Sequence, residues 1–129
     1  MDAQQSVLIV DRSAENREVL QTALERRGLR IFSAGKARQG LELAREHHPD
    51  VIVLDLELDD SSEESVSASF AEQSRTDRAP LVLLGSLRRP ALPEGEFVAK
   101  PYHYGPLIRK IEELLNARPR DTLPCRRCS

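Results

Sequence analysis

The chain contains no tryptophan, and its 129 residues include only two tyrosines, three phenylalanines, one methionine and two cysteines. Since large aromatic residues are scarce, a buried core has to be built from leucine, valine, isoleucine and alanine. Both cysteines, Cys125 and Cys128, lie within the last five residues, so they cannot form a disulfide framework for a fold. They make one C-x-x-C pair, which is half of a zinc site, and the sequence assigns them no role.

Long apolar runs and an excess of one charge are also absent. No apolar run reaches the ~20 residues of a membrane span, and the polar opening MDAQQS is unlike a signal peptide. The net charge is −2 with 31% charged residues, so no overall attraction to nucleic acid or to a membrane surface is indicated. We therefore expect a cytoplasmic protein that contacts neither directly, and its length is typical of one domain.

Short apolar runs alternate with amphipathic segments along the chain. The runs predict five strands, at residues 7–10, 30–32, 51–54, 81–84 and 97–99. Helical periodicity predicts four regular helices, at about residues 14–27, 37–47, 64–74 and 107–116. Strands that alternate with helices form βαβ units with right-handed crossovers. We therefore predict an α/β fold with a doubly wound, five-stranded parallel sheet in the strand order 2-1-3-4-5.

The first helix has recognisable end signals. Ser13 is a candidate N-cap, and Gly28 is expected at the C′ position. One apolar stripe should face the sheet, formed by Val19, Leu20, Ala23 and Leu24.

Two segments lack regular periodicity. Only twelve residues, GSLRRPALPEGE, separate Leu84 from Phe97, and Pro90 and Pro93 oppose a regular helix there. The crossover helix before the fifth strand, which would be the fourth helix, is therefore expected to be shortened or irregular. The residues RPRDTLPCRRCS at 118–129 have no apolar period, so we expect a disordered tail or linker after a single domain at 1–117.

Three chemically active side chains follow predicted strands. Asp11 closes the run VLIVD, Asp55 closes VIVLD, and Lys100 comes directly after the fifth strand. Open parallel sheets bind ligands at the carboxyl ends of their strands. A carboxylate that accepts a phosphoryl group needs a divalent cation and benefits from a lysine on the phosphoryl oxygens. This reasoning makes Asp55 the candidate nucleophile, Asp11 an acid beside the metal and Lys100 the cation.

With these residues in place, the chain resembles the receiver domain of bacterial two-component response regulators. The resemblance covers about residues 6–117 and rests on VLIVDRSAENR, PDVIVLDLEL, APLVLLGS and FVAKPY. It implies a flavodoxin-like fold, a signalling module without enzymatic activity, and a sensor histidine kinase or another signalling protein as partner. It also implies that Asp55 is the phosphoacceptor, Lys100 the phosphate-sensing lysine and Asp11 an acid of the Mg²⁺ site.

The same resemblance assigns three further positions. Glu57 would offer its backbone carbonyl to the metal, alongside Asp11 and Asp55. Phe97 falls at an aromatic position that rotates on activation. The Lys100–Pro101 peptide bond would be cis, as is typical of that family, and proline makes such a bond accessible.

Departures from the family pattern affect the same pocket. Arg12 stands where a second metal-binding acid is usual, so it would repel Mg²⁺ or pair with Asp55 in its place. Gly85 stands where a hydroxyl is usual, although Ser86 follows it. Asp59 or Asp60 are candidates to replace the lost ligand. We expect Mg²⁺ binding to be weak or absent.

Three functional hypotheses follow. The chain is a phosphoacceptor switch at Asp55, or a pseudo-receiver that binds proteins without Mg²⁺ or phosphate, which Arg12 and Gly85 favour. The third is a small hydrolase on the same fold, but the sequence has neither a glycine-rich phosphate loop nor a serine–histidine arrangement.

Overall fold

The computed structural model describes residues 4–56, 63–85 and 96–117. Its single sheet contains five parallel strands in the order β2-β1-β3-β4-β5, which confirms the predicted topology. The strands are β1 (Ser6–Val10), β2 (Arg30–Ala34), β3 (Val51–Asp55), β4 (Leu81–Gly85) and β5 (Glu96–Ala99). The helices are α1 (Ala14–Glu25), α2 (Ala37–His47), α3 (Glu63–Asp77) and α4 (Tyr104–Ala117).

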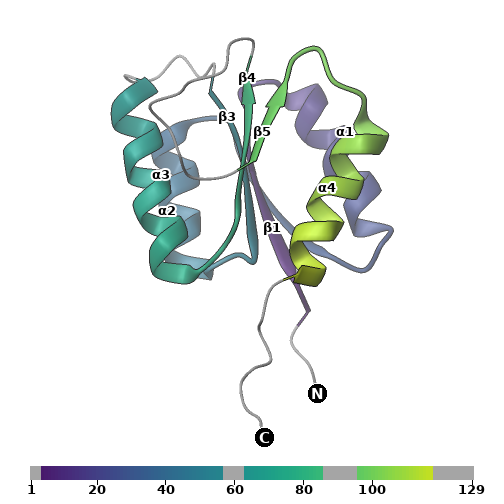
Figure 1. The fold of residues 1–129 in the computed structure, drawn as a ribbon, viewed down its shortest axis with the longest axis horizontal. Helices are drawn as coiled ribbons and strands as arrows, with labels where there is room; N and C mark the ends of the chain where they lie inside the picture. Colours follow the sequence, from purple (N-terminus) through teal and green to yellow (C-terminus); the bar gives the residue numbers. More distant parts are fainter. Residues whose placement is uncertain (1–3, 57–62, 86–95, 118–129) are drawn as a thin grey trace, which may run out of the picture.

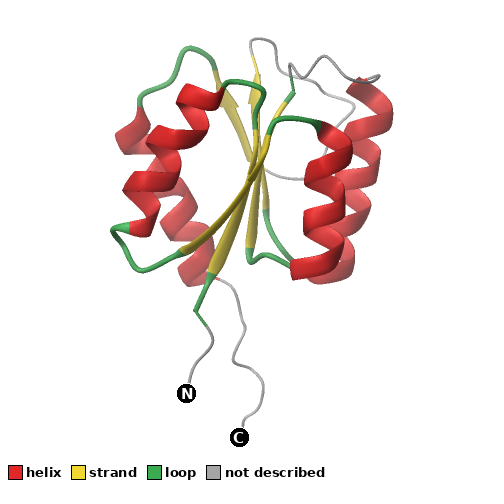
Figure 2. Ribbon diagram, turned by 180° about the vertical axis from the view of Figure 1, so that it is seen from behind, coloured by secondary structure: helices red, strands yellow, loops and turns green. Residues whose placement is uncertain are grey.

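The described helices cover both faces of the sheet. Figures 1 and 2 show α1 and α4 on one face and α2 and α3 on the other. This three-layer arrangement follows from right-handed crossovers between parallel strands. Within the described part of the chain, every helix is too short or too polar to cross a bilayer.

Burial along the strands explains their order in the sheet. All five residues of each of β1, β3 and β4 are buried, whereas β2 and β5 are partly exposed. A strand that is covered on both faces reads as a continuous apolar run. The strands with the longest apolar runs therefore occupy the centre, and they carry Asp11 and Asp55 at their ends.

Alternation along the strands divides the core into two clusters. One cluster packs beneath α1 and α4, with Val7, Ile9, Leu20, Leu24, Val53, Leu107 and Ile111 among its members. The other packs beneath α2 and α3, with Leu8, Val10, Ala44, Ile52, Leu54, Phe70 and Leu83 among its members. Successive strand residues point to opposite faces, so one strand supplies both clusters.

Local predictions for α1 are partly confirmed. Ser13 is the N-cap, since its side chain accepts from the backbone N–H of Asn16. Gly28 has a positive φ of 83°, but the cap residue is Arg26, so Gly28 lies one position beyond the predicted C′. The apolar stripe was predicted too wide, because Val19 is 40% exposed. Its position lies at the rim of the face that buries Leu20.

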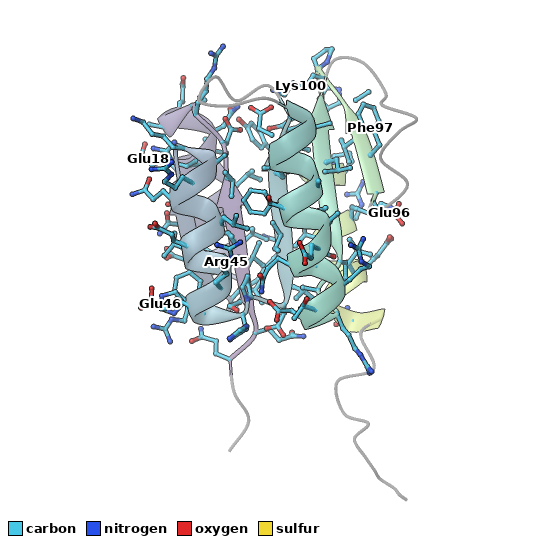
Figure 3. The ribbon with its side chains drawn as sticks, turned by 90° about the vertical axis from the view of Figure 1, so that its left-hand side faces the viewer. Glu18, Arg45, Glu46, Glu96, Phe97 and Lys100 are labelled. Atoms are coloured by element: carbon cyan, nitrogen blue, oxygen red, sulfur yellow. The ribbon has the colours of Figure 1, made fainter. Side chains whose placement is uncertain are left out.

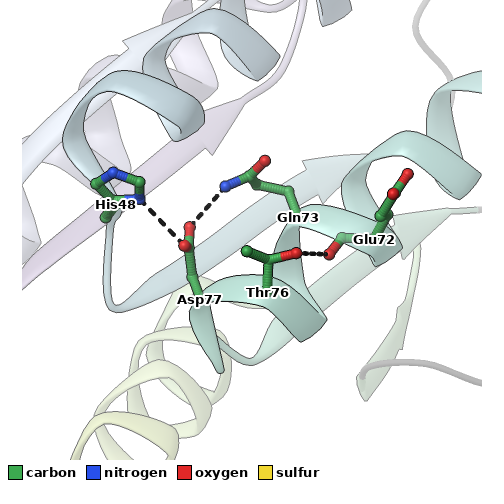
Figure 4. Close-up of polar contacts among 5 residues, drawn as sticks. All are labelled: His48, Glu72, Gln73, Thr76 and Asp77. Atoms are coloured by element: carbon green, nitrogen blue, oxygen red, sulfur yellow. Dashed lines mark hydrogen bonds and ion pairs between the residues drawn. The ribbon is translucent and has the colours of Figure 1, made fainter.

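A polar contact joins the ends of α2 and α3. His48 follows α2 in the left-handed conformation, with φ 49°. Its Nδ1 atom lies 3.0 Å from Oδ1 of Asp77, which also accepts from Gln73 at 2.9 Å on its second oxygen (Figure 4). This contact lies at the opposite end of the helices from Asp55, and it ties the α2–α3 layer together.

Two predictions lie outside the described residues. The irregular fourth helix was expected between Leu84 and Phe97 and the disordered tail within 118–129, and the structure describes neither residues 86–95 nor residues 118–129.

Gly40 gives a test of the packing beneath α2. A Cβ atom at Gly40 would lie 2.6 Å from Cγ2 of Val10, a fully buried and stiff side chain. Overpacking costs about 1–3 kcal/mol, which exceeds the gain of about 1 kcal/mol in helix propensity. We expect Gly40→Ala to lower the free energy of unfolding, measured by urea denaturation.

Gly105 provides the matched control within α4. The nearest atom to a Cβ there is Nη1 of Arg109 at 3.9 Å. Gly105→Ala should therefore raise stability by about 0.4–1 kcal/mol. Equal effects of the two substitutions would contradict the assigned contact between α2 and β1.

Candidate functional site

Three side chains from separate strands meet at the carboxyl edge of the sheet. Asp55 is the last residue of β3, Asp11 directly follows β1, and Lys100 directly follows β5. The Nζ atom of Lys100 donates to Oδ1 of Asp55 at 2.8 Å, and Figure 3 shows Lys100 at this edge of the molecule. The predicted proximity of Asp55 and Lys100 is confirmed.

Lys100 is positioned by its own backbone. Its N–H donates to the carbonyl of Gly85 at 2.9 Å, which fixes the residue against the end of β4. The Lys100–Pro101 peptide bond is cis, as the resemblance implied. The side chain of Lys100 is 22% exposed and that of Asp55 only 4%. Since water screens this pair poorly, its attraction is stronger than that of a surface ion pair.

Asp11 is held from several sides. Its backbone N–H donates to the carbonyl of Ala34 at 3.0 Å, and its own carbonyl accepts from Nη1 of Arg17. Its Oδ1 atom accepts from the backbone N–H of Ser13 at 2.8 Å. The residue is 1% exposed. These bonds fix the carboxylate in a buried cluster with Asp55 and Lys100, which together form the acidic pocket.

The two aspartates act on each other. Burial raises the pKa of Asp11 above 3.8, and the charge of Asp55 and a hydrogen bond between the two carboxyls raise it further. The N–H of Ser13 and the charge of Lys100 act in the opposite direction. Two carboxylates this close repel each other when both are ionised. The pocket therefore favours either a shared proton or an added cation.

The chemistry of this donor set fits Mg²⁺ incompletely. Mg²⁺ is commonly held by one or two carboxylates together with water, and Asp11 and Asp55 are suitable. In residues 4–56, 63–85 and 96–117, no group of three acidic, histidine or cysteine side chains is assembled for a metal. Arg12 stands beside Asp11 with its side chain exposed. The pocket thus offers two carboxylates and no third acid in the described residues.

Several candidate ligands lie outside the described residues. These are Glu57, Asp59 and Asp60, which follow β3 in the sequence, and Ser86, which follows β4. Their roles stay predictions.

The end of β4 carries no polar side chain. A Cβ atom at Gly85 would lie 3.4 Å from Cδ1 of Leu56 and 3.5 Å from Cε1 of Phe97. The ring of Phe97, which is half-buried on β5 (Figure 3), therefore lies close beside Gly85. Apolar atoms border the position that a hydroxyl would occupy.

The sequence analysis missed three polar residues next to this pocket. Burial raises the pKa of Tyr102 to about 12, and the charges of Asp11 and Asp55 act in the same direction. Within the described residues, the buried Tyr102 hydroxyl has no hydrogen-bond partner. Tyr104 donates to Oδ1 of Asn16, whose amide donates to Asp11. Only the closeness of these tyrosines to Lys100 in the sequence signalled them.

The raised pKa of Asp11 predicts a pH-dependent stability. The native state binds this proton more tightly than the unfolded chain does. The resulting stabilisation is complete below pH 3.8 and is lost as the pH rises through the raised pKa, by at most about 1.4 kcal/mol per pH unit. Asp11→Asn keeps a hydrogen-bonding amide without an ionising proton. The free energy of unfolding of this variant, relative to that of the wild type, should therefore increase as the pH rises from 3.8.

Urea denaturation of both proteins across this pH range measures the difference. A constant difference at every pH would show that Asp11 titrates normally in the folded state.

Known structures share this fold. The chain superimposes on the chemotaxis protein CheY4 of Vibrio cholerae with a TM-score of 0.75 and 22% identity, over 87% of this chain and 99% of that one. It superimposes equally well, at 20% identity, on the receiver domain of the sensor histidine kinase PA1611 from Pseudomonas aeruginosa, over 89% of this chain and all of that one. That second structure contains a magnesium ion coordinated in its active-site cleft.

The chain is also similar in sequence to curated regulatory proteins. The chain is 32% identical over 127 residues to the KDP operon transcriptional regulatory protein KdpE of Escherichia coli, covering 92% of this chain and 55% of that protein. It is 29% identical over 77 residues to the polar-differentiation response regulator DivK of Brucella ovis, covering 60% of this chain and 63% of that protein. The chain thus spans little more than half the length of these relatives.

The family model for the response regulator receiver domain matches residues 7–84, which include Asp11, Asp55, all of β2 and β3 and most of β1 and β4. The match covers well over half of the chain, and the sheet order and pocket agree with it. The chain therefore belongs to the response regulator receiver domain family.

Proposed function

We propose that this receiver domain, at residues 1–117 with 118–129 as a tail or linker, accepts a phosphoryl group on Asp55 in the cytoplasm. The donor would be a sensor histidine kinase or another signalling protein of a two-component pathway. The observation that carries this proposal is the 2.8 Å contact between Lys100 Nζ and Asp55 Oδ1, beside the buried Asp11. A nucleophilic carboxylate and a cation for the phosphoryl oxygens are thus already together.

The proposed transfer uses groups that the pocket contains. A carboxylate oxygen of Asp55 attacks the phosphorus, the bond from phosphorus to the donor's imidazole nitrogen breaks, and the imidazole takes up a proton. The ammonium of Lys100 then offsets the charge of the phosphoryl oxygens. Bound Mg²⁺, held by Asp11 and Asp55, would supply further neutralisation of those oxygens.

The pocket has a weakened cation site in this proposal. Arg12 directly follows Asp11 and brings a positive charge where an acid would attract Mg²⁺. The pair of Asp55 with Lys100 then neutralises the resting pocket in part. We infer that Mg²⁺ binds weakly and that phosphoryl transfer is correspondingly slow.

A second candidate function is binding of a signalling partner without phosphorylation. Arg12 favours it because a pocket that repels Mg²⁺ loses most of its catalytic help, and Gly85 favours it because no side chain there can bond a phosphoryl group. The comparisons give no support to a small hydrolase. The two remaining candidates differ in whether Asp55 is ever modified.

Phosphorylation is tested by incubating the chain with acetyl phosphate and Mg²⁺ and measuring the intact mass. The first proposal predicts a slowly accumulating species heavier by one phosphoryl group. Asp55→Asn should abolish it, since the amide is not a nucleophile of this kind. No added mass after prolonged incubation, in a protein shown to be folded, would favour the phosphorylation-independent function.

The cation site is tested separately by calorimetric titration with Mg²⁺. The wild-type chain should show no sub-millimolar binding, and Arg12→Asp should tighten binding at least tenfold, or about 1.4 kcal/mol. Arg12→Ala is the matched control, because it removes the positive charge without adding a ligand and should give an intermediate affinity. Sub-millimolar binding by the wild type would contradict the assignment.

A further inference from the structure

Asn16 connects the acidic pocket to the first residue of α4. Its side-chain amide donates through Nδ2 to Oδ2 of Asp11 at 3.5 Å. Its Oδ1 atom accepts a short hydrogen bond from the hydroxyl of Tyr104. Asn16 lies in the first turn of α1 and Tyr104 opens α4, so this chain of bonds joins residues 88 positions apart in the sequence.

The donor directions in this connection are consistent with one another. An ionised carboxylate only accepts hydrogen bonds, so the Asn16 amide must turn its NH₂ group to Asp11 and its oxygen to Tyr104. The backbone N–H of Asn16 is capped by Ser13, which also donates its own N–H to Asp11. Asn16 is therefore held at its backbone by the same turn that holds the pocket acid.

The two bonds differ in length. The Tyr104–Asn16 contact is short, whereas 3.5 Å is at the long limit for a hydrogen bond. A group that competes for Oδ2 of Asp11 would break the long bond first. The Asn16 amide would then lose its acceptor. The Tyr104 hydroxyl would either move together with the amide or lose its hydrogen bond to Asn16.

The connection lies at one end of a packed helix pair. Toward the other end, Nε of Arg27, which follows the C-terminal cap of α1, lies 2.8 Å from Oε2 of Glu112 on α4. Leu20 and Ile111 belong to the core cluster between these helices and the sheet. A change at Tyr104 therefore acts on a helix whose remaining contacts with α1 stay in place.

Within the described residues, no side chain at the end of β4 provides an equivalent polar connection. Gly85 has no side chain, and Leu56 and Phe97 lie beside it. In the described residues, Asn16 is the one helix side chain that hydrogen-bonds the Asp11 carboxylate. The observed polar route from Asp11 to a helix thus leads to α1 and α4.

We propose that Asn16 and Tyr104 form a hydrogen-bonded link through which a cation or phosphoryl group in the Asp11–Asp55 pocket changes the contact between α1 and the start of α4. The inference deepens the proposed function, on which it rests for its natural input. The link itself exists without phosphorylation, so it can be tested without any ligand.

Asp11→Asn breaks the link at the pocket end. The single side-chain oxygen of the new residue is needed by the Ser13 N–H, which leaves an NH₂ group facing the NH₂ group of Asn16. Tyr104→Phe breaks the other end by removing one oxygen atom. Tyr102→Phe is the matched control, because it removes the neighbouring hydroxyl that has no partner in the described residues.

The readout is the set of backbone amide resonances of α4 in ¹⁵N-labelled protein. Asp11→Asn should shift resonances over residues 104–111 in the native and Tyr102→Phe backgrounds. In the Tyr104→Phe background these shifts should fall to less than half. Equal shifts in all three backgrounds would show a through-space effect of the lost charge and would overturn the link.

A reciprocal measurement needs no substitution at Asp11. Coupling between two sites acts in both directions, so Tyr104→Phe should move the side-chain carboxyl ¹³C resonance of Asp11. Glu112→Gln, which weakens the α1–α4 contact at its far end, should leave that resonance in place. An Asp11 carboxyl resonance that is unchanged by Tyr104→Phe would overturn the link. Failure of acetyl phosphate to modify Asp55 would instead contradict only the proposed function.

Discussion

The structure depends on the burial of two carboxylates side by side at the ends of adjacent parallel strands. Asp11 and Asp55 are almost fully covered, and the Lys100 ammonium donates a hydrogen bond to Asp55. Such a pair is stable only with a proton, a cation or a transferred group to offset its charge. The fold buries both carboxylates because β1 and β3 lie at the centre of the sheet, under helices on both faces. The pocket's chemistry is a consequence of that placement.

The residues around the pocket determine how the negative charge of the two carboxylates is offset. Lys100 reaches Asp55 because its backbone is bonded to Gly85, and Arg12 brings a further positive charge next to Asp11 in the sequence. On the α1 side, Asn16 gives the Asp11 carboxylate a second partner that leads to α4. The same carboxylate can therefore be a ligand and the start of a structural connection.

Much of this architecture was predictable from the sequence. Continuous apolar runs identified the central strands, and an acid directly after such a run has to lie at the carboxyl edge, so the meeting of Asp55 with Lys100 followed from topology. The exposure of Val19 did not, because the width of a helix's buried face depends on what packs against it. The link through Asn16 and Tyr104 was also missed, since the rotation of α1 relative to α4 is set by core packing between segments far apart in the chain. The predicted irregular helix and tail concern residues that the structure does not describe.

The central claim is that Asp55 is the group that receives a phosphoryl group in this pocket. Its most direct test is chemical trapping, because borohydride reduces an aspartyl phosphate to homoserine and marks the modified residue permanently. After incubation with acetyl phosphate and Mg²⁺, reduction and proteolysis, mass spectrometry of the peptide that contains Asp55 should find homoserine at position 55, and Asp11 should be unchanged. Homoserine at another acid, or none in a folded protein, would contradict the account.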